Sequence, residues 1–193
     1  YTEDAQFLSS TAGLTDGGFV VTWGSSEQDG SHSSVYGQRY DSNGNPVGGE
    51  FKVNTYSESG QSEPSVTGLI EGGFVATWMS YGQDGSHWGI YGQRYDFSGN
   101  AVGPEFQVNT YTDDWQATPS VSALSTGNFV VTWMSNGQDG SNAGVYGQIF
   151  GTDSNPDTDD DFDDSDAFVA PVSTEPSQGT PAAGAAGMLA DEP

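Results

Sequence analysis

The chain has 193 residues, and 27 acidic side chains against three Lys and Arg give it a formal net charge of −24. A charge of this size repels nucleic acid and anionic membranes, so we expect neither a nucleic-acid partner nor membrane insertion. The sequence contains no cysteine, which excludes disulfides, thiolate catalysis and cysteine-based zinc sites.

Residues 1–150 contain three copies of one sequence repeat, without an insertion. Its clearest marker recurs every 55 residues, at Gly17–Trp23, Gly72–Trp78 and Gly127–Trp133. A strict period indicates structural units that pack on their neighbours, because one such unit cannot bury its apolar residues alone. We expect the copies to cover about residues 6–60, 61–115 and 116–150.

The second copy is complete and predicts four short antiparallel strands. Aromatic and β-branched residues favour strands, and the segment Asp96–Asn100 is typical of a hairpin turn. No capped stretch with a 3.6-residue apolar period predicts a helix. The expected strands are Pro64–Leu69, Phe74–Trp78, Ile90–Tyr95 and Glu105–Thr110.

The predicted fold is therefore all-β, built from repeated four-stranded antiparallel units that resemble β-propeller blades. A closed propeller needs about four to eight blades, and this chain has two full copies and one that stops after its third strand. The sequence leaves three arrangements open, namely an open arc, a longer array, and a ring that other chains complete.

The tail over residues 151–193 is acidic at first and then rich in Ala, Gly and Pro, which predicts disorder. Its alternating carboxylates could bind calcium weakly, although the glycine and the late glutamate of an EF-hand loop are missing. Asp166–Val172 could instead supply the missing fourth strand of the third copy, or fill a gap in a neighbouring chain. The candidate ligands are Asp157, Asp159, Asp161 and Asp163.

The loop Gln-Asp-Gly-Ser occurs once in each copy and is the best candidate site within the repeats. Asp-Gly in a connection is first of all a turn device, but carboxylate and carbonyl oxygens can also bind calcium. Both interpretations stay open for the three loop aspartates, Asp29, Asp84 and Asp139.

Trp88 and Trp115 each occur in only one copy and lie in predicted loops. Such residues can stack on a sugar ring or contribute to a contact between chains. Every Asp in the repeats has near-equivalents in the other copies, so no unique acid–base pair stands out. We therefore expect a protein that is not an enzyme, and an enzyme acting on polysaccharide is the weakest of the alternatives.

The words FVVTW, QDGS, YGQRYD-x-x-GN, VG-x-EF and VNT together resemble a repeat of large secreted bacterial proteins of the calcium-binding, RTX-type or adhesin-like kind. The resemblance covers about residues 1–150 and implies an extracellular, non-catalytic, β-rich repeat. The nonapeptide calcium repeat of true RTX domains is absent.

We therefore expect a secreted or cell-surface structural and adhesive module that associates with itself or with neighbouring repeats in a larger array or filament. The alternative is a calcium-dependent, lectin-like module that binds glycans. Calcium is the only cofactor that the sequence suggests.

Overall fold

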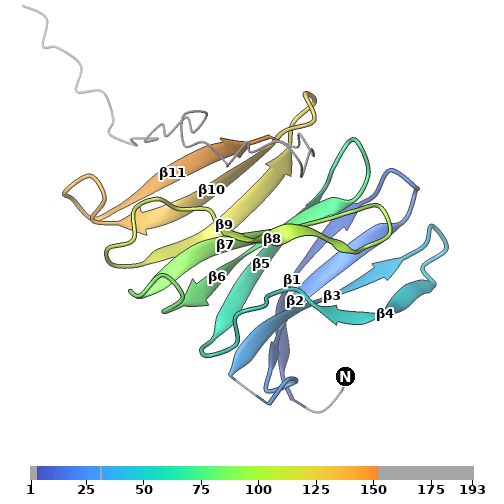
Figure 1. Ribbon diagram of the computed structural model, residues 1–193, viewed down its shortest axis with the longest axis horizontal. Coiled ribbons are helices and arrows are strands. Elements are labelled where there is room, and N and C mark those ends of the chain that lie inside the picture. The colour runs from blue at the N-terminus through green and yellow to red at the C-terminus, as the bar shows by residue number, and fades with distance from the viewer. Residues whose placement is uncertain (1–3, 31, 152–193) are drawn as a thin grey trace, which may run out of the picture.

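A computed structural model describes residues 4–30 and 32–151 of the chain (Figure 1). These residues form eleven strands and no helix, so no helix among them is long and apolar enough to span a membrane. The strands are β1 (Gln6–Gly13), β2 (Phe19–Ser26), β3 (Ser33–Tyr40), β4 (Pro46–Lys52), β5 (Gln61–Gly68), β6 (Phe74–Tyr81), β7 (Trp88–Tyr95), β8 (Ala101–Gln107), β9 (Gln116–Ala123), β10 (Phe129–Asn136) and β11 (Ala143–Phe150).

The strands form three antiparallel sheets, in each of which every strand pairs with the next along the chain. We call β1–β4 the first unit, β5–β8 the second and β9–β11 the third. Figure 1 shows the second unit, in green, between the other two. The predicted all-β fold of repeated, blade-like units is confirmed, and within the described residues the units form an arc.

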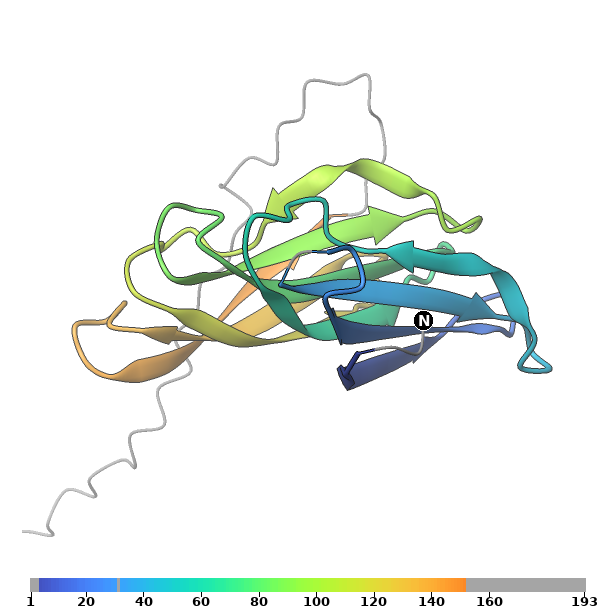
Figure 2. The same cartoon turned by 90° about the horizontal axis from the view of Figure 1, so that it is seen from below.

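The first strands of the three units lie next to one another along the inside of this arc (Figure 2). The Val66 amide donates to Ser10 Oγ at 3.2 Å, and the Val121 amide donates to Ser65 Oγ at 3.1 Å. A Cβ atom on Gly68 would stand 2.2 Å from the Gly13 carbonyl oxygen, so only glycine permits this approach. The inner strands β1, β5 and β9 therefore join the units.

The strands β2, β6 and β10 have nearly the same sequence and yet bury different sides. In β6 both sides are buried from Phe74 to Ser80, because the second unit has a neighbour on each side. The first and third units have one neighbour each, so their burial alternates with opposite phase. The buried residues are Val20 and Thr22 in β2, and Phe129, Val131 and Trp133 in β10.

This difference defines two faces of every unit. The aromatic face carries Phe74, Ala76 and Trp78 in the second unit, and the valine face carries Val75, Thr77 and Ile90. At each junction the aromatic face of one unit packs on the valine face of the unit before it. The arc therefore has a direction. Among the described residues no unit packs on the aromatic face of the first unit or on the valine face of the third, and we call these two faces the free faces.

The fourth strand of the second unit begins earlier than its sequence predicts. It starts at Ala101 and ends at Gln107, whereas the sequence analysis expects a strand over Glu105–Thr110. Gly103 takes a φ of +68°, and the register shifts between Gly92 and Arg94 on the partner strand. A β-bulge thus accommodates the glycine and the proline without ending the strand.

Candidate functional site

The three Gln-Asp-Gly-Ser loops form tight turns between the second and third strands of their units. The amide of Gly85 donates to the Gly82 carbonyl at 3.1 Å, and that of Gly140 donates to Gly137 at 3.0 Å. Asp84 Oδ1 accepts the Ser86 amide at 3.0 Å, and Asp139 Oδ1 accepts the Ser141 amide at the same distance. Each of these two aspartates therefore holds its own turn, which is the structural role that Asp-Gly predicts.

The carboxylates of Asp29 and Asp84 have different surroundings. Asp29 Oδ2 accepts a hydrogen bond from Ser34 Oγ at 2.9 Å and forms an ion pair with Lys52. The second copy has Gln107 in place of this lysine, and Asp84 Oδ2 is buried without a hydrogen-bond partner. Burial, together with Asp84 and then Glu105, raises the pKa of the nearby Tyr91 hydroxyl.

Within residues 4–30 and 32–151, no group of three or more His, Asp or Glu side chains is arranged to hold a metal ion. Calcium binding at Asp29, Asp84 and Asp139 stays a prediction. Asp157, Asp159, Asp161 and Asp163, as well as Asp166–Val172, lie outside the described residues.

Trp88 belongs to an aromatic cluster at one end of the second unit. Its ring meets Tyr81 edge to face at a centroid distance of 5.3 Å, and Tyr81 meets His87 in the same way at 6.0 Å. Tyr81 is 42% exposed, while Trp88 also packs against the core between the second and third units. Trp115 lies in the connection before β9, where its carbonyl accepts the Asn136 amide at 3.0 Å.

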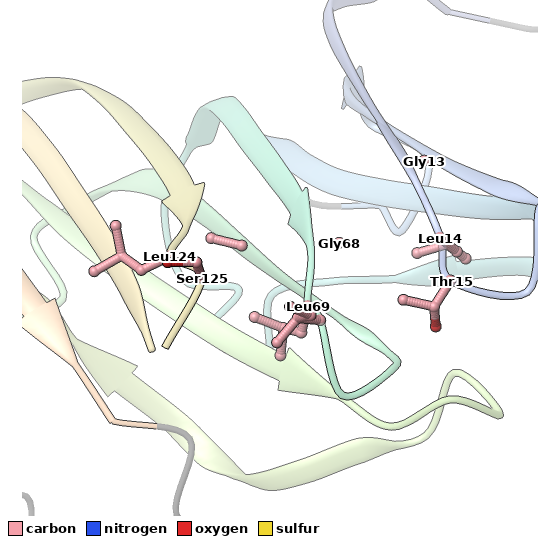
Figure 3. Close-up of a pocket in the computed structure, with 9 residues that line it drawn as sticks. Gly13, Leu14, Thr15, Gly68, Leu69, Leu124 and Ser125 are labelled. Carbon is pink, nitrogen blue, oxygen red and sulfur yellow. The ribbon is translucent and has the colours of Figure 1, made fainter. Parts of the chain in front are cut away.

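A pocket of about 350 Å³ opens where the three inner strands end (Figure 3). The same three positions of each copy line it, and none of the lining side chains is ionisable. The lining residues are Gly13, Leu14, Thr15, Gly68, Leu69, Ile70, Ala123, Leu124 and Ser125. The sequence signal that could have revealed it is the Leu at position 14, repeated at 69 and 124.

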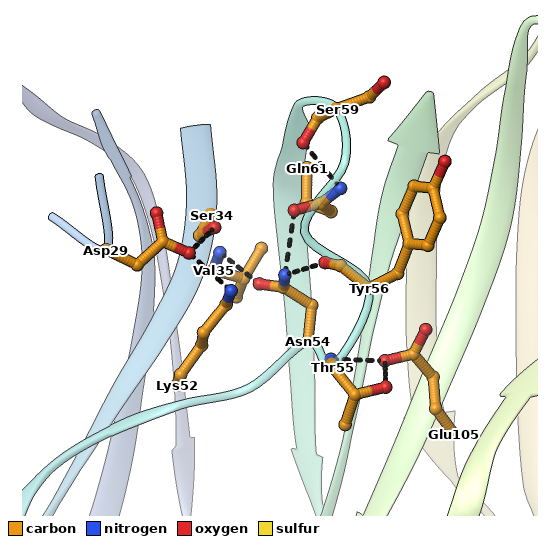
Figure 4. A network of polar contacts seen from close by, with 10 residues as sticks. All are labelled: Asp29, Ser34, Val35, Lys52, Asn54, Thr55, Tyr56, Ser59, Gln61 and Glu105. Atoms are coloured by element: carbon orange, nitrogen blue, oxygen red, sulfur yellow. Dashed lines mark hydrogen bonds and ion pairs between the residues drawn. The ribbon is translucent and has the colours of Figure 1, made fainter. Parts of the chain in front are cut away.

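A buried amide network, which the sequence analysis missed, joins each unit to the next. Figure 4 shows it between the first and second units. Asn54 Oδ1 accepts the Val35 amide at 2.7 Å, and Asn54 Nδ2 donates to Gln61 Oε1 of the second unit at 2.8 Å. Asn109 repeats both contacts with Ile90 and Gln116, at 2.6 and 3.1 Å. The Asn of Val-Asn-Thr, just after the fourth strand, therefore links the third strand of its own unit to the first strand of the next. Its recurrence with a Gln seven residues later was the available signal.

Each inner strand contains one residue with a strained backbone at the same position. Leu8, Glu63 and Thr118 take φ values of 52°, 51° and 53°, where side chains other than glycine are disfavoured. A register shift accompanies each of them. Their side chains differ completely in chemistry, so the three copies are not equivalent at this point of the inner surface.

The two ends of the arc expose the two halves of an internal junction. On the valine face of the third unit, Val145 is 43% exposed, whereas its equivalents Val35 and Ile90 are fully buried. On the aromatic face of the first unit, Phe19 and Trp23 are only partly buried, whereas their counterparts in the other two units are fully or almost fully buried.

No protein-family model matches the sequence, and no curated protein matches it. Among solved structures, a protein of unknown function from Dyadobacter fermentans is similar with a TM-score of 0.58 and 9% identity, over 78% of this chain and 52% of that one. This likeness supports the fold.

Two enzymes are also similar. The endo-arabinase from Bacteroides thetaiotaomicron has a TM-score of 0.47 and 18% identity, over 74% of this chain and 55% of its own. A thermostable family-43 glycoside hydrolase has a TM-score of 0.49 and 12% identity, over 84% and 53%. The chain spans about half the length of all three structures.

The prediction that the chain is not an enzyme is wrong, because an endo-arabinase and a family-43 glycoside hydrolase are among the solved structures with a similar fold. The prediction relied on three equal copies leaving no unique site. Leu8, Glu63 and Thr118 show the error, because equivalent backbone positions carry an apolar, an acidic and a hydroxyl side chain.

Proposed function

We propose that the chain is a structural building block that assembles head to tail, with the valine face of one copy against the aromatic face of the next. The observation that supports the proposal is the pair of terminal faces. Each matches a face that is fully buried at the two internal junctions. A contact between copies would therefore repeat side-chain packing that this sequence already makes twice.

The residues on the two free faces agree with such an assembly. The free valine face carries Val130, Met134, Val145 and Ile149, and the free aromatic face carries Phe19, Val21 and Trp23. A contiguous apolar patch on a soluble protein commonly marks an interaction site. Because the two faces differ, the contact is heterologous and generates a ring or an open filament.

We also propose that the assembly lies outside the cell or on its surface. The charge of −24 and the resemblance to repeats of large secreted bacterial proteins support a surface or extracellular array, in which salt or calcium screens the repulsion. Adhesion through the exposed loops belongs to the same proposal.

Two charge substitutions test the proposal at opposite ends of the arc. Val21→Asp places a charge on the aromatic face of the first unit, and Val130→Asp places one on the valine face of the third. We expect the wild-type chain to gain mass with concentration in sedimentation velocity and each variant to stay monomeric. Mixing the variants should give a dimer and nothing larger, because each retains one intact face.

Phe97→Asp is the matched control, since Phe97 is 64% exposed in the β7–β8 turn and outside both faces. It adds the same charge and should assemble like the wild-type chain. A wild-type chain that stays monomeric up to about millimolar concentration, where even weak contacts form, would contradict the proposal. So would a mixture of the two variants that shows no dimer.

A second candidate function is carbohydrate binding at the cluster of Tyr81, His87 and Trp88. These three side chains occur together only in the second copy, and they offer exposed aromatic surface beside the polar loop around Asp84. A glycan array with and without calcium tests this candidate. Tyr81→Ala should abolish binding, whereas Trp115→Ala, outside the cluster, should leave it unchanged.

A further inference from the structure

We propose that the outer edge of β11 binds an extended peptide with the fourth-strand sequence Glu-Phe-x-Val-Asn. This chain carries that sequence at Glu50–Asn54 and Glu105–Asn109. The proposal concerns the edge of the third sheet, and it holds whether or not the valine face of that sheet contacts a second copy.

The backbone of β11 offers the same hydrogen-bonding groups that the fourth strands use in the other units. The Val35 carbonyl accepts the Val53 amide at 2.8 Å, and the Val35 amide donates to Asn54. Ile90 makes the same two contacts with Val108 and Asn109. Val145 is their equivalent, and within the described residues β11 pairs with β10 alone. Such an edge is a template for an added strand.

A glycine on the third strand of each unit provides room for an aromatic ring. A Cβ atom on Gly37 would lie 2.7 Å from Phe51, and one on Gly92 would lie 2.6 Å from Phe106. At Gly147 the nearest atoms among the described residues are Thr132 Cγ2 and the Val131 carbonyl oxygen, at 3.2 and 3.4 Å. No described residue of the third unit thus fills the space that a fourth-strand Phe occupies elsewhere.

Two glutamines of the third unit complete the match. In the second unit, Gln83 Nε2 donates to Glu105 Oε1 at 2.5 Å, and Gln93 Nε2 donates to the carbonyls of Val102 and Gly103 at 3.3 and 3.2 Å. Gln138 and Gln148 hold the same two positions in the third unit. Gln138 is therefore placed to donate to an acidic residue before the Phe of the peptide, and Gln148 to backbone carbonyls two and three positions before that residue.

The sequence of the tail lacks the features that this edge requires. Phe162 and Phe168 are its only aromatic residues, and neither is followed by Val and Asn at the second and third places. Phe168 has Ala170 and Pro171 there, and a proline side chain cannot accept the Val145 amide. These features favour a segment of another polypeptide as the occupant.

A synthetic peptide of residues 101–110 tests the proposal, with the full-length Val21→Asp variant as its receptor. That variant lacks the aromatic face needed for head-to-tail contact and leaves the third unit unchanged. We expect saturable one-to-one binding in calorimetry, together with slower hydrogen exchange at the Val145 amide. A peptide with Ala at the position of Phe106, or of Asn109, should bind at least about tenfold more weakly.

Gly147→Ala is the matched receptor variant, because its Cβ would stand where the Phe ring is expected. The same Cβ would also lie 3.2 Å from Thr132 Cγ2 and 3.4 Å from the Val131 carbonyl oxygen, so we expect a small loss of stability in urea. Binding should be abolished while the variant still unfolds in one cooperative transition. Equal affinity for the Ala peptides, unchanged affinity in Gly147→Ala, or no binding at about millimolar peptide would overturn the proposal. So would a Val145 amide already protected in the free chain, since a segment of the same chain would then occupy the edge.

Discussion

Single buried amides decide how firmly neighbouring units are joined. Asn109 is almost fully buried and satisfies groups in β7, in β9 and in the connection between β8 and β9, with bonds to Ile90, Gln116 and Tyr111. A buried polar group that loses its partner costs more than the bond itself contributed. The Asn of the Val-Asn-Thr motif therefore stabilises the junction between units.

Replacing Asn109 by alanine should lower the free energy of unfolding by roughly 2–4 kcal/mol, because the Ile90 amide and Gln116 Oε1 lose a partner in the interior. Urea denaturation measures this change. Asn43→Ala, in the exposed turn after β3, is the control and should change stability by less than about 0.5 kcal/mol. Equal effects of the two substitutions would contradict the role given to Asn109.

The hairpin turn at Asp96 predicts a pH effect at the same scale. Hydrogen bonds from the Asn100 side chain and from the Asn100 amide hold the pKa of the Asp96 carboxyl below its usual value of 3.8. A lowered pKa in the folded state means that the stabilisation is present above pH 3.8 and is lost as the pH falls through the lower value. Asp96→Ala should therefore destabilise the chain at neutral pH, and the difference from wild type should shrink in acid. Denaturation series at several pH values check this, with Glu71→Ala as a control in another turn.

At the scale of the strand, equivalent residues of the three copies contribute different amounts to stability, because different units pack on them. Val20, Val75 and Val130 occupy the same place in three nearly identical strands, but only the first two lie under another unit. Val20→Ala and Val75→Ala should each cost roughly 2 kcal/mol of stability, from lost burial and the space left behind. Val130→Ala should cost less than about 0.5 kcal/mol in the monomer. Urea denaturation at low protein concentration measures all three, and equal costs would contradict the directional packing.

The same strands show which features local sequence could predict. The period, the strand segments Phe74–Trp78 and Ile90–Tyr95, and the turn at Asp96 follow from β-branched residues, aromatic residues and Gly-Asn chemistry over a few positions. Sequence did not predict the further residues of these strands, up to Tyr81 in β6 and from Trp88, which was expected in a loop, in β7. The phase of burial in β2 and β10 depends on which side has a neighbour, and the two sequences do not encode that difference. The start of β8 depends on a bulge, and the pocket at Leu14 depends on three loops that meet only in the folded chain.

For the whole molecule, the negative net charge opposes the head-to-tail assembly that the free aromatic and valine faces favour. A chain of net charge −24 repels a second copy, and added salt shortens the range of that repulsion from about 30 Å at 0.01 M to about 10 Å at 0.1 M. The dissociation constant for head-to-tail contact should therefore fall by about tenfold or more as NaCl rises across this range. Sedimentation equilibrium measures it. A series in CaCl₂ at equal ionic strength is the comparison, and a response to calcium at far lower ionic strength would indicate specific binding in addition to screening.

The fixed interval between junctions has a consequence for heredity. Every junction uses the same kind of contact at the same spacing. A tandem duplication or deletion of the gene segment that encodes one whole repeat therefore leaves each remaining unit with a neighbour whose surface fits its own. Length can then vary between generations by recombination alone, without any new interface having to arise by mutation.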